Sequence, residues 1–203
     1  MKKKPNGILI WTACALGLAL TTHVAAAATI ASYTAGMDPP SNSFEWGESF
    51  TTPGGGPWNG LQFIFYADAP PTTPDAGGIA YLLSSEYLGT PGNLSSSTPG
   101  FIAQSTGISA NMYVFNPSVT LNANTEYWVY ETAALNITGT SVGAGTPGEH
   151  AYGSNGNNFV SLPAAVANFT LSGSLAPAVP EPSTIALMGI ALVAGVLSRK
   201  LSR

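Results

Sequence analysis

The chain has 203 residues, a formal net charge of −4 and one cysteine. All six basic residues lie at the two ends, and no lysine or arginine occurs between Lys4 and Arg199. A body without basic side chains cannot neutralise phosphates, which excludes nucleic acid as a partner, and a lone cysteine, Cys14, excludes a disulfide scaffold.

The N-terminus has the order of segments that is typical of a secretory signal peptide. Lysines at positions 2 to 4 precede an apolar stretch over residues 8–20, and small residues follow at 25–28. We therefore predict a signal peptide over residues 1–28, cut by signal peptidase within 25–28. Cys14 lies inside the apolar stretch instead of after it, which argues against a lipoprotein anchor.

The body, residues 29–175, shows short apolar and aromatic stretches separated by Gly, Pro, Asn and Ser. Glycines and prolines interrupt every candidate helical period, so we expect no helix there. About eight strands in this length indicate a single all-β domain, an antiparallel β-sandwich or jelly roll. The expected strands are FEWGESFTTP, LQFIFYAD, GIAYLLSSEYL, FIAQST, NMYVFNP, SVTL, TEYWVYETA and NFTLSGSL. Residues 146–165 are expected to form a long loop.

The body contains one histidine, His150, which is the only imidazole that could activate a serine or threonine nucleophile. Glu149 and Ser154 stand near it in the sequence. A catalytic triad, however, needs convergent geometry that proximity along the chain does not supply. The pattern favours a solvated loop histidine over a catalytic base.

Paired carboxylates for glycoside cleavage must face each other across a cleft. Glu126 and Glu131 share one expected strand, and Glu45 and Glu48 share another. Each pair is separated by an odd number of residues, which places its members on opposite faces of the strand. We therefore expect no enzymatic activity and no catalytic residue.

Calcium is the metal that the composition best suits, because it takes carboxylate and carbonyl oxygens. Candidate ligands are Asp75, Asn155, Asn157 and Asn158. No EF-hand or nonapeptide spacing accompanies them. We expect no cofactor, with a structural Ca²⁺ site as the alternative and its ligands left unassigned.

Glu126, Trp128 and Tyr130 share one face of the strand TEYWVYETA by alternation. Flat aromatic rings match the apolar faces of pyranoses, so this face is a candidate saccharide contact if it is exposed. The alternative is that the aromatic residues fill the core of the sandwich.

The C-terminal tail, residues 176–203, ends in an apolar stretch over 185–197 that covers about 20 Å as a helix, short of the bilayer's hydrocarbon core of about 30 Å. Pro180 and Pro182 hold the chain extended and present Glu181 just ahead of it. At the other end, basic side chains would keep the terminus in the cytoplasm. These retention residues are Arg199, Lys200 and Arg203.

The tail resembles the PEP-CTERM sorting signal of Gram-negative bacteria. The resemblance rests on "VPEPST" with its motif Pro180–Glu181–Pro182, an apolar helix at about 184–198 and a basic end at 199–203. It implies recognition by exosortase, a membrane cysteine transpeptidase, and a transient stay in the inner membrane through the C-terminal helix.

The body is similar to the choice-of-anchor domains of bacterial surface proteins. The similarity covers Phe44 to Glu131 and rests on the turn Gly89–Thr90–Pro91–Gly92–Asn93–Leu94 and on the strand from Leu121 to Tyr127–Trp128. It implies a sandwich fold and a surface setting without a defined activity.

Together these features predict an exported, non-catalytic protein of the cell surface or exopolysaccharide matrix of a Gram-negative bacterium. Its expected partners are signal peptidase, exosortase and exopolysaccharide. The alternatives are a carbohydrate-binding module and, less favoured, a secreted hydrolase.

The distribution of basic residues makes a first prediction. Trypsin cuts after lysine or arginine, and neither occurs between Pro5 and Ser198. Digestion of the denatured chain should leave one large fragment that contains residues 5–198 and ends at Arg199, which mass spectrometry would detect. Any specific tryptic cut inside that interval would contradict the prediction.

Overall fold

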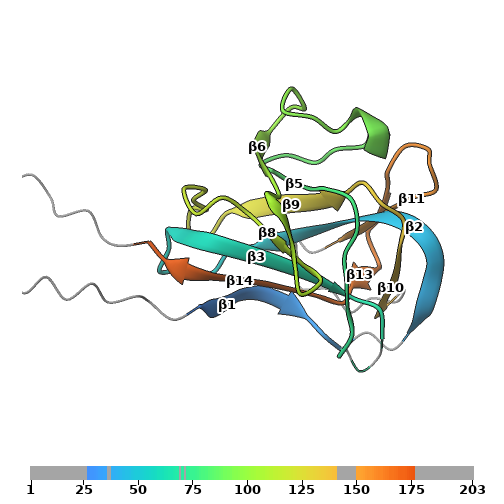
Figure 1. Ribbon diagram of the computed structural model, residues 1–203, viewed down its shortest axis with the longest axis horizontal. Helices are drawn as coiled ribbons and strands as arrows, with labels where there is room; N and C mark the ends of the chain where they lie inside the picture. Colours follow the sequence, from blue (N-terminus) through green and yellow to red (C-terminus); the bar gives the residue numbers. More distant parts are fainter. Residues whose placement is uncertain (1–26, 36–37, 69, 71, 141–149, 177–203) are drawn as a thin grey trace, which may run out of the picture.

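The protein is a β-sandwich of two antiparallel sheets packed face to face (Figure 1). The computed structural model describes residues 27–35, 38–68, 70, 72–140 and 150–176. Within these ranges no residue is in an α-helix, and the one helical turn is the 3₁₀ helix η1 (Pro91–Asn93). The sandwich predicted for the body is confirmed. The predicted signal peptide and C-terminal helix lie outside the described residues.

The smaller sheet has six strands and contains both ends of the described chain. Its order is β1 (Ala28–Tyr33), β14 (Phe169–Leu175), β3 (Trp58–Tyr66), β8 (Met112–Val114) and β7 (Gly107–Ser109), with β4 (Pro74–Asp75) also paired to β3. Because β1 lies antiparallel to β14, with Ala28 opposite Gly173, the described chain begins and ends at the same end of the sandwich.

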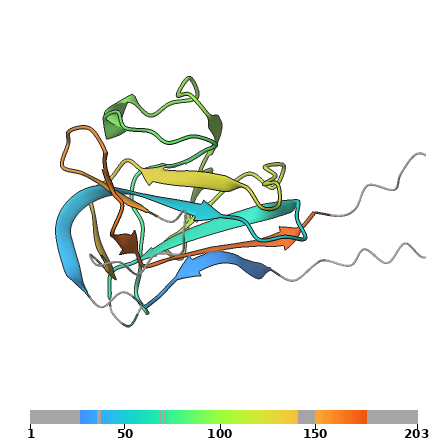
Figure 2. The ribbon, with the colours of Figure 1, turned by 180° about the vertical axis from the view of Figure 1, so that it is seen from behind.

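The larger sheet has eight strands and is organised around the long, bent strand β2 (Figure 2). Its order is β12 (Val160–Leu162), β11 (Ala151–Ser154), β2 (Asp38–Thr51), β9 (Glu126–Glu131), β5 (Ala80–Leu83) and β6 (Phe101–Gln104), with β10 (Leu135–Thr140) paired to β2 and to β13 (Val166–Ala167). The first part of β2 pairs with β10, and its second part pairs with β11 on one side and β9 on the other.

Aromatic rings from both sheets form the core between them. Phe63 and Phe169 of the smaller sheet stack with centroids 5.4 Å apart and planes 7° from parallel. Phe50 of β2 contacts both rings from the larger sheet, at 6.3 and 6.5 Å, and Tyr127 of β9 lies 6.0 Å from Phe50. Rings of this size remove large apolar areas from water, and this burial is the main stabilising contribution to the packing of the two sheets.

A second aromatic cluster covers the outer face of the larger sheet. At its centre the side chain of Tyr130 is fully buried, with ring centroids 5.3 Å from Tyr152 and 4.8 Å from Phe159. The segment 84–100, which projects between β5 and β6 in Figure 1, lies over it, and Tyr87 N–H donates to the Tyr130 hydroxyl at 3.0 Å. Leu94 is buried in the same cluster. The larger sheet is therefore buried on both of its faces at strand β9.

The strand predictions were partly wrong in the second half of the body. The stretch 146–165, expected to be a loop, contains β11 and β12, and the expected strand SVTL forms only an isolated bridge between Leu121 and Trp58. Strands β11 (AYGS) and β12 (VSL) are only four and three residues long, and the stretch between them is rich in Asn and Gly, so the local signal for strand is weak. Their pairing with β2 supplies the hydrogen bonds that propensity does not indicate.

The contact between Gly47 and Tyr130 generates a prediction about stability. These residues are cross-strand partners, and a Cβ at position 47 would lie 2.3 Å from Cδ1 of the Tyr130 ring. Gly47→Ala should lower the free energy of unfolding by about 1–3 kcal/mol, the usual cost of overpacking. Gly153→Ala is the matched control, because its Cβ would meet only Leu162 at 3.6 Å.

Thermal or urea unfolding of both variants measures this difference. Truncating the ring in the double variant Gly47→Ala/Tyr130→Leu should make the two effects less than additive. Equal stability for the two glycine variants would contradict the packing described for Gly47.

Candidate functional site

The sorting motif Pro180–Glu181–Pro182 and the retention residues Arg199, Lys200 and Arg203 lie outside the described residues. The described chain ends at Ala176, whose N–H donates to the Pro57 carbonyl at 2.8 Å. This bond fixes the point at which the tail leaves the sandwich. In the described part of the chain, no helix has the length and apolar character that a membrane span requires.

The predicted saccharide face of β9 is largely covered by other parts of the protein. Glu126, Trp128 and Tyr130 share the face opposite to Tyr127 and Val129, as the alternation predicted. Tyr130, however, is fully buried beneath segment 84–100, so its ring cannot stack on a sugar in this structure. The exposed aromatic face on which the prediction depended is absent at Tyr130, because the segment between β5 and β6 folds back over the sheet.

The half-buried Trp128 is held by a hydrogen bond instead of presenting a free ring edge. Its indole N–H donates to the Tyr152 hydroxyl at 3.1 Å. Burial raises the pKa of Tyr152 to about 12, the bond from Trp128 opposes that shift, and the nearby Glu86 carboxylate adds to it. The Tyr152 hydroxyl therefore stays protonated at neutral pH, and these groups form part of the outer cluster.

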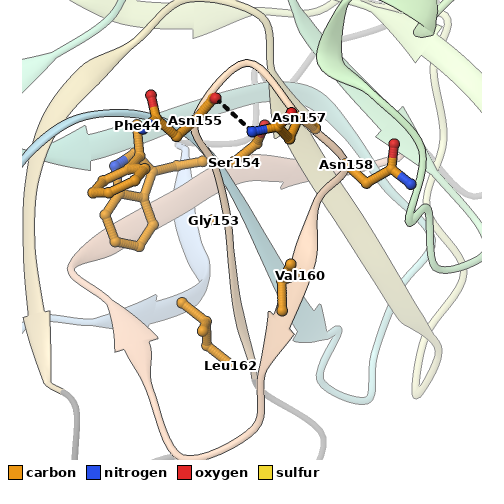
Figure 3. A pocket seen from close by; sticks show the side chains of 9 residues that line it. Phe44, Gly153, Ser154, Asn155, Asn157, Asn158, Val160 and Leu162 are labelled. Atoms are coloured by element: carbon orange, nitrogen blue, oxygen red, sulfur yellow. Dashed lines mark hydrogen bonds between the residues drawn. The ribbon is translucent and has the colours of Figure 1, made fainter.

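A pocket of about 420 Å³ opens on the larger sheet, at a place that the sequence did not indicate (Figure 3). Trp46, Gly153 and Val160 are successive cross-strand partners and so share one face of β2, β11 and β12. It is the face that forms the core further along the sheet, where Glu48 is paired with the buried Val129. Val160 remains 60% exposed, so the smaller sheet does not cover this end of the face.

The walls of the pocket are apolar and its rim carries amides. Phe44 and Trp46 meet edge to face, with centroids 6.3 Å apart and planes at 84°. Val160 and Leu162 point into the same space from β12 (Figure 3). The loop between β11 and β12 forms the rim, which is lined by Asn155, Asn157 and Asn158.

The rim loop is held in shape by its own hydrogen bonds. Ser154 Oγ donates to the Asn157 carbonyl at 2.7 Å, and Asn157 Nδ2 donates to the Asn155 carbonyl at 3.2 Å. The Glu45 carboxylate accepts the Gly156 N–H at 3.0 Å. Among the described residues, no hydrogen bond engages the side-chain amides of Asn155 and Asn158, which are exposed at the rim.

The histidine does not form a catalytic arrangement with Ser154 in this structure. His150 exchanges hydrogen bonds with Ser49, whose hydroxyl accepts the His150 N–H at 2.8 Å and whose N–H donates to the His150 carbonyl at 3.0 Å. Ser154 stands about 13 Å further along the extended chain and donates to Asn157 instead. Glu149 lies outside the described residues. His150 is half-buried just before β11, and its Nδ1 atom is buried without a hydrogen-bond partner among the described residues.

The candidate calcium ligands are divided between the two sheets. Asn155, Asn157 and Asn158 gather at the rim of the pocket, whereas Asp75 belongs to β4 of the smaller sheet and accepts the Asn136 N–H at 3.2 Å. Within the described ranges, no group of three or more His, Cys, Asp or Glu side chains is placed to hold a metal.

Two acids that the sequence did not single out as buried lie inside the sandwich. Glu48 accepts the Ala167 N–H at 2.8 Å, and Glu131 accepts the Trp46 and Ala133 N–H groups, each at 2.6 Å. Both side chains are fully buried. Burial raises the pKa of Glu131 to about 9, against the lowering effect of the two N–H donors. No substrate can reach either carboxyl in this structure, and both serve as acceptors for backbone amides.

The predicted opposition of each acid pair is confirmed by the strand pairing. Glu45 is opposite Ser154 and Glu48 is opposite Ala151, on alternate faces of β2. Glu131 shares the core face of β9 with Val129, whereas Glu126 lies on the other face.

Comparison with known proteins identifies the tail. Residues 178–200 match the family model of the PEP-CTERM protein-sorting motif. The motif at the C-terminus indicates export, sorting by exosortase and surface localisation. No curated protein and no solved structure matches the chain.

The neutral Glu131 carboxyl makes stability depend on pH. Its pKa rises from 4.5 to about 9 on folding, so between these values the folded chain holds a proton that the unfolded chain has released. This proton makes the free energy of unfolding fall as pH rises, by at most about 1.4 kcal/mol per pH unit. In Glu131→Gln this contribution disappears, and the decline between pH 5 and 8 should be shallower.

Urea unfolding at several pH values measures the slope. The Gln amide can accept from only one of the two N–H groups, so Glu131→Gln should be less stable than the native chain at pH 5. Between pH 5 and pH 8, however, its free energy of unfolding should fall by less than that of the native chain. Glu126→Gln, the same replacement on the other face of β9, is the matched control. Parallel pH profiles for the native chain and Glu131→Gln would contradict the raised pKa.

Proposed function

We propose that the chain is a non-catalytic protein of the cell surface or exopolysaccharide matrix of a Gram-negative bacterium. The observation that carries the proposal is the sorting motif at 178–200, which follows directly on a folded β-sandwich. A secretory N-terminus over residues 1–28 and a choice-of-anchor-like body agree with such a role.

The proposed route begins with signal peptidase, which removes the N-terminal segment during export. The apolar stretch 185–197 then holds the chain in the inner membrane, with the basic end in the cytoplasm. Exosortase recognises Pro180–Glu181–Pro182 at the outer side of the membrane and frees or transfers the body. An anchor too short for a comfortable span suits a segment that is held only until processing.

The absence of catalysis is supported by what the reactive side chains do in the fold. Glu48 and Glu131 are fully buried acceptors of backbone N–H groups, and the Ser154 hydroxyl donates to the Asn157 carbonyl. These three groups are thus engaged in holding a strand or a loop. A glycoside hydrolase would need two carboxyl groups facing a cleft.

The sorting proposal predicts the effect of changes in the motif. Glu181→Gln removes the charge at nearly constant size, and replacing Pro180 and Pro182 by Ala lets the following helix extend through the site. In a host with exosortase, each change should leave an unprocessed, membrane-held precursor as the main species. Fractionation with an antibody against the body reports both size and location.

Pro177→Ala is the matched control, because it removes a neighbouring proline outside 178–200 and should be processed normally. In a host without exosortase, the native chain should also remain in the membrane fraction. If the Pro180, Glu181 and Pro182 variants reach the surface or the medium at native size and yield, the tail is only an anchor and the sorting route is wrong.

A further inference from the structure

We propose that the pocket between Phe44, Trp46, Val160 and the loop 155–158 binds a sugar unit of a neutral glycan. This inference rests on the matrix role proposed above and assigns that role a binding site. The site differs from the face of Glu126, Trp128 and Tyr130, which the outer cluster largely covers.

The walls and rim together match the chemistry of a pyranose. A pyranose ring has apolar C–H faces and an equatorial belt of hydroxyl groups, so it is bound by aromatic surface and by amide hydrogen bonds. The pocket offers the rings of Phe44 and Trp46 at its walls. The amides of Asn155 and Asn158 at its rim are not engaged by other described residues and can both donate and accept.

The size of the pocket suits a small part of a chain. Its volume of about 420 Å³ lies toward the lower end of the range of about 300–1,000 Å³ that is typical of small-molecule sites. Its mouth is open along the exposed Val160. A long polysaccharide can therefore place one unit in the pocket while the rest of the chain continues across the surface.

The absence of basic side chains from the body favours a neutral glycan over an anionic one. No lysine or arginine occurs between Lys4 and Arg199, so the body has no permanently charged cation that could pair with a uronate, sulfate or phosphate. The Glu45 carboxylate accepts the Gly156 N–H of the rim loop and adds negative potential there. An anionic sugar would meet repulsion without a compensating ion pair.

The pocket also lies at the end of the sandwich away from the tail. The tail leaves beside Pro57, near the C-terminal end of β2, whereas Phe44 and Trp46 lie near the middle of this strand, about 15–25 Å back from its end. In Figure 1 the described chain begins and ends on the left, and the bend of β2 is on the right. A body still tethered by its C-terminus would thus present the pocket away from the membrane.

The test uses the full-length chain in phospholipid nanodiscs, which contain neither sugar nor detergent that could occupy the pocket. Isothermal titration calorimetry measures binding of neutral oligosaccharides of glucose, galactose, mannose and N-acetylglucosamine, with an oligouronate as the anionic comparison. We expect at least one neutral oligosaccharide to bind and the oligouronate not to bind.

Two exposed positions decide where the sugar binds without disturbing the core. Val160→Asp places a charge in the apolar wall and should weaken binding at least about tenfold. Asn158→Ala removes a rim amide and should weaken it about three- to tenfold. Ile108→Asp is the matched control, because Ile108 is also an exposed apolar residue on an edge strand but belongs to the smaller sheet; its affinity should equal that of the native chain.

Trp46→Ala should abolish binding, and Trp46→Phe, which keeps a ring, should retain part of it. Because Trp46 also packs against the core, unfolding curves of these variants must be measured as well. If Trp46→Ala does not fold, the effect of Val160→Asp on affinity tests whether the pocket is the binding site.

Several results would overturn the assignment. The assignment is wrong if no neutral oligosaccharide binds, if Val160→Asp leaves binding unchanged, or if the oligouronate binds more tightly than the neutral oligosaccharides. Light scattering that shows a dimer dissociated by Val160→Asp would assign the face to a second copy of the chain instead. Normal exosortase-dependent display of a protein that binds no glycan would reject the pocket and keep the surface role, whereas failure of display would reject the role itself.

Discussion

The register between β2 and β9 is the constraint on which the other features depend. Gly47 lies opposite Tyr130 and Phe50 opposite Tyr127, so each strand sends alternate residues to opposite faces of the sheet. A slip of one residue would turn Tyr130 into the inner core if β9 shifted, or turn Phe50 out of it if β2 shifted. The register is specified from both sides, because the Tyr130 ring needs the space above Gly47 and the Phe50 ring completes the cluster between the sheets.

Burial on both faces explains why the larger sheet holds charged groups inside. The core face of β9 ends at Glu131, which accepts two backbone N–H groups, and that of β2 contains Glu48, which accepts the Ala167 N–H. Burying a charged carboxylate is unfavourable unless it is hydrogen-bonded or paired. Burial raises the pKa of Glu131, so its carboxyl stays protonated and the charged form is not buried at neutral pH. Glu48 and Glu131, which the sequence offers as candidate acids for hydrolysis, thus bind backbone amides in the fold.

The two ends of the sandwich have different roles in the proposed function. One end joins the tail that carries the sorting motif, and the other bears the pocket of Phe44, Trp46 and the asparagine loop. The bent strand β2 contributes to both, and the exposure of Val160 shows that the smaller sheet does not cover the face at the pocket. A protein held at a membrane by one end and open to glycan at the other would suit a component of a surface matrix.

The sequence by itself determined the all-β class, the opposite faces of Glu126 and Glu131 and the sorting motif, because these depend on local signals: strand alternation, interruption by Gly and Pro, and a contiguous tail. Only the tertiary structure decided that Tyr130 is covered, that β11 and β12 are strands, and that Trp46 and Asn158 line one pocket. Alternation assigns residues to a face without saying what lies over it. The covering of Tyr130 by segment 84–100 and the pairing of β11 with β2 join residues far apart in the chain, and no local pattern encodes such contacts.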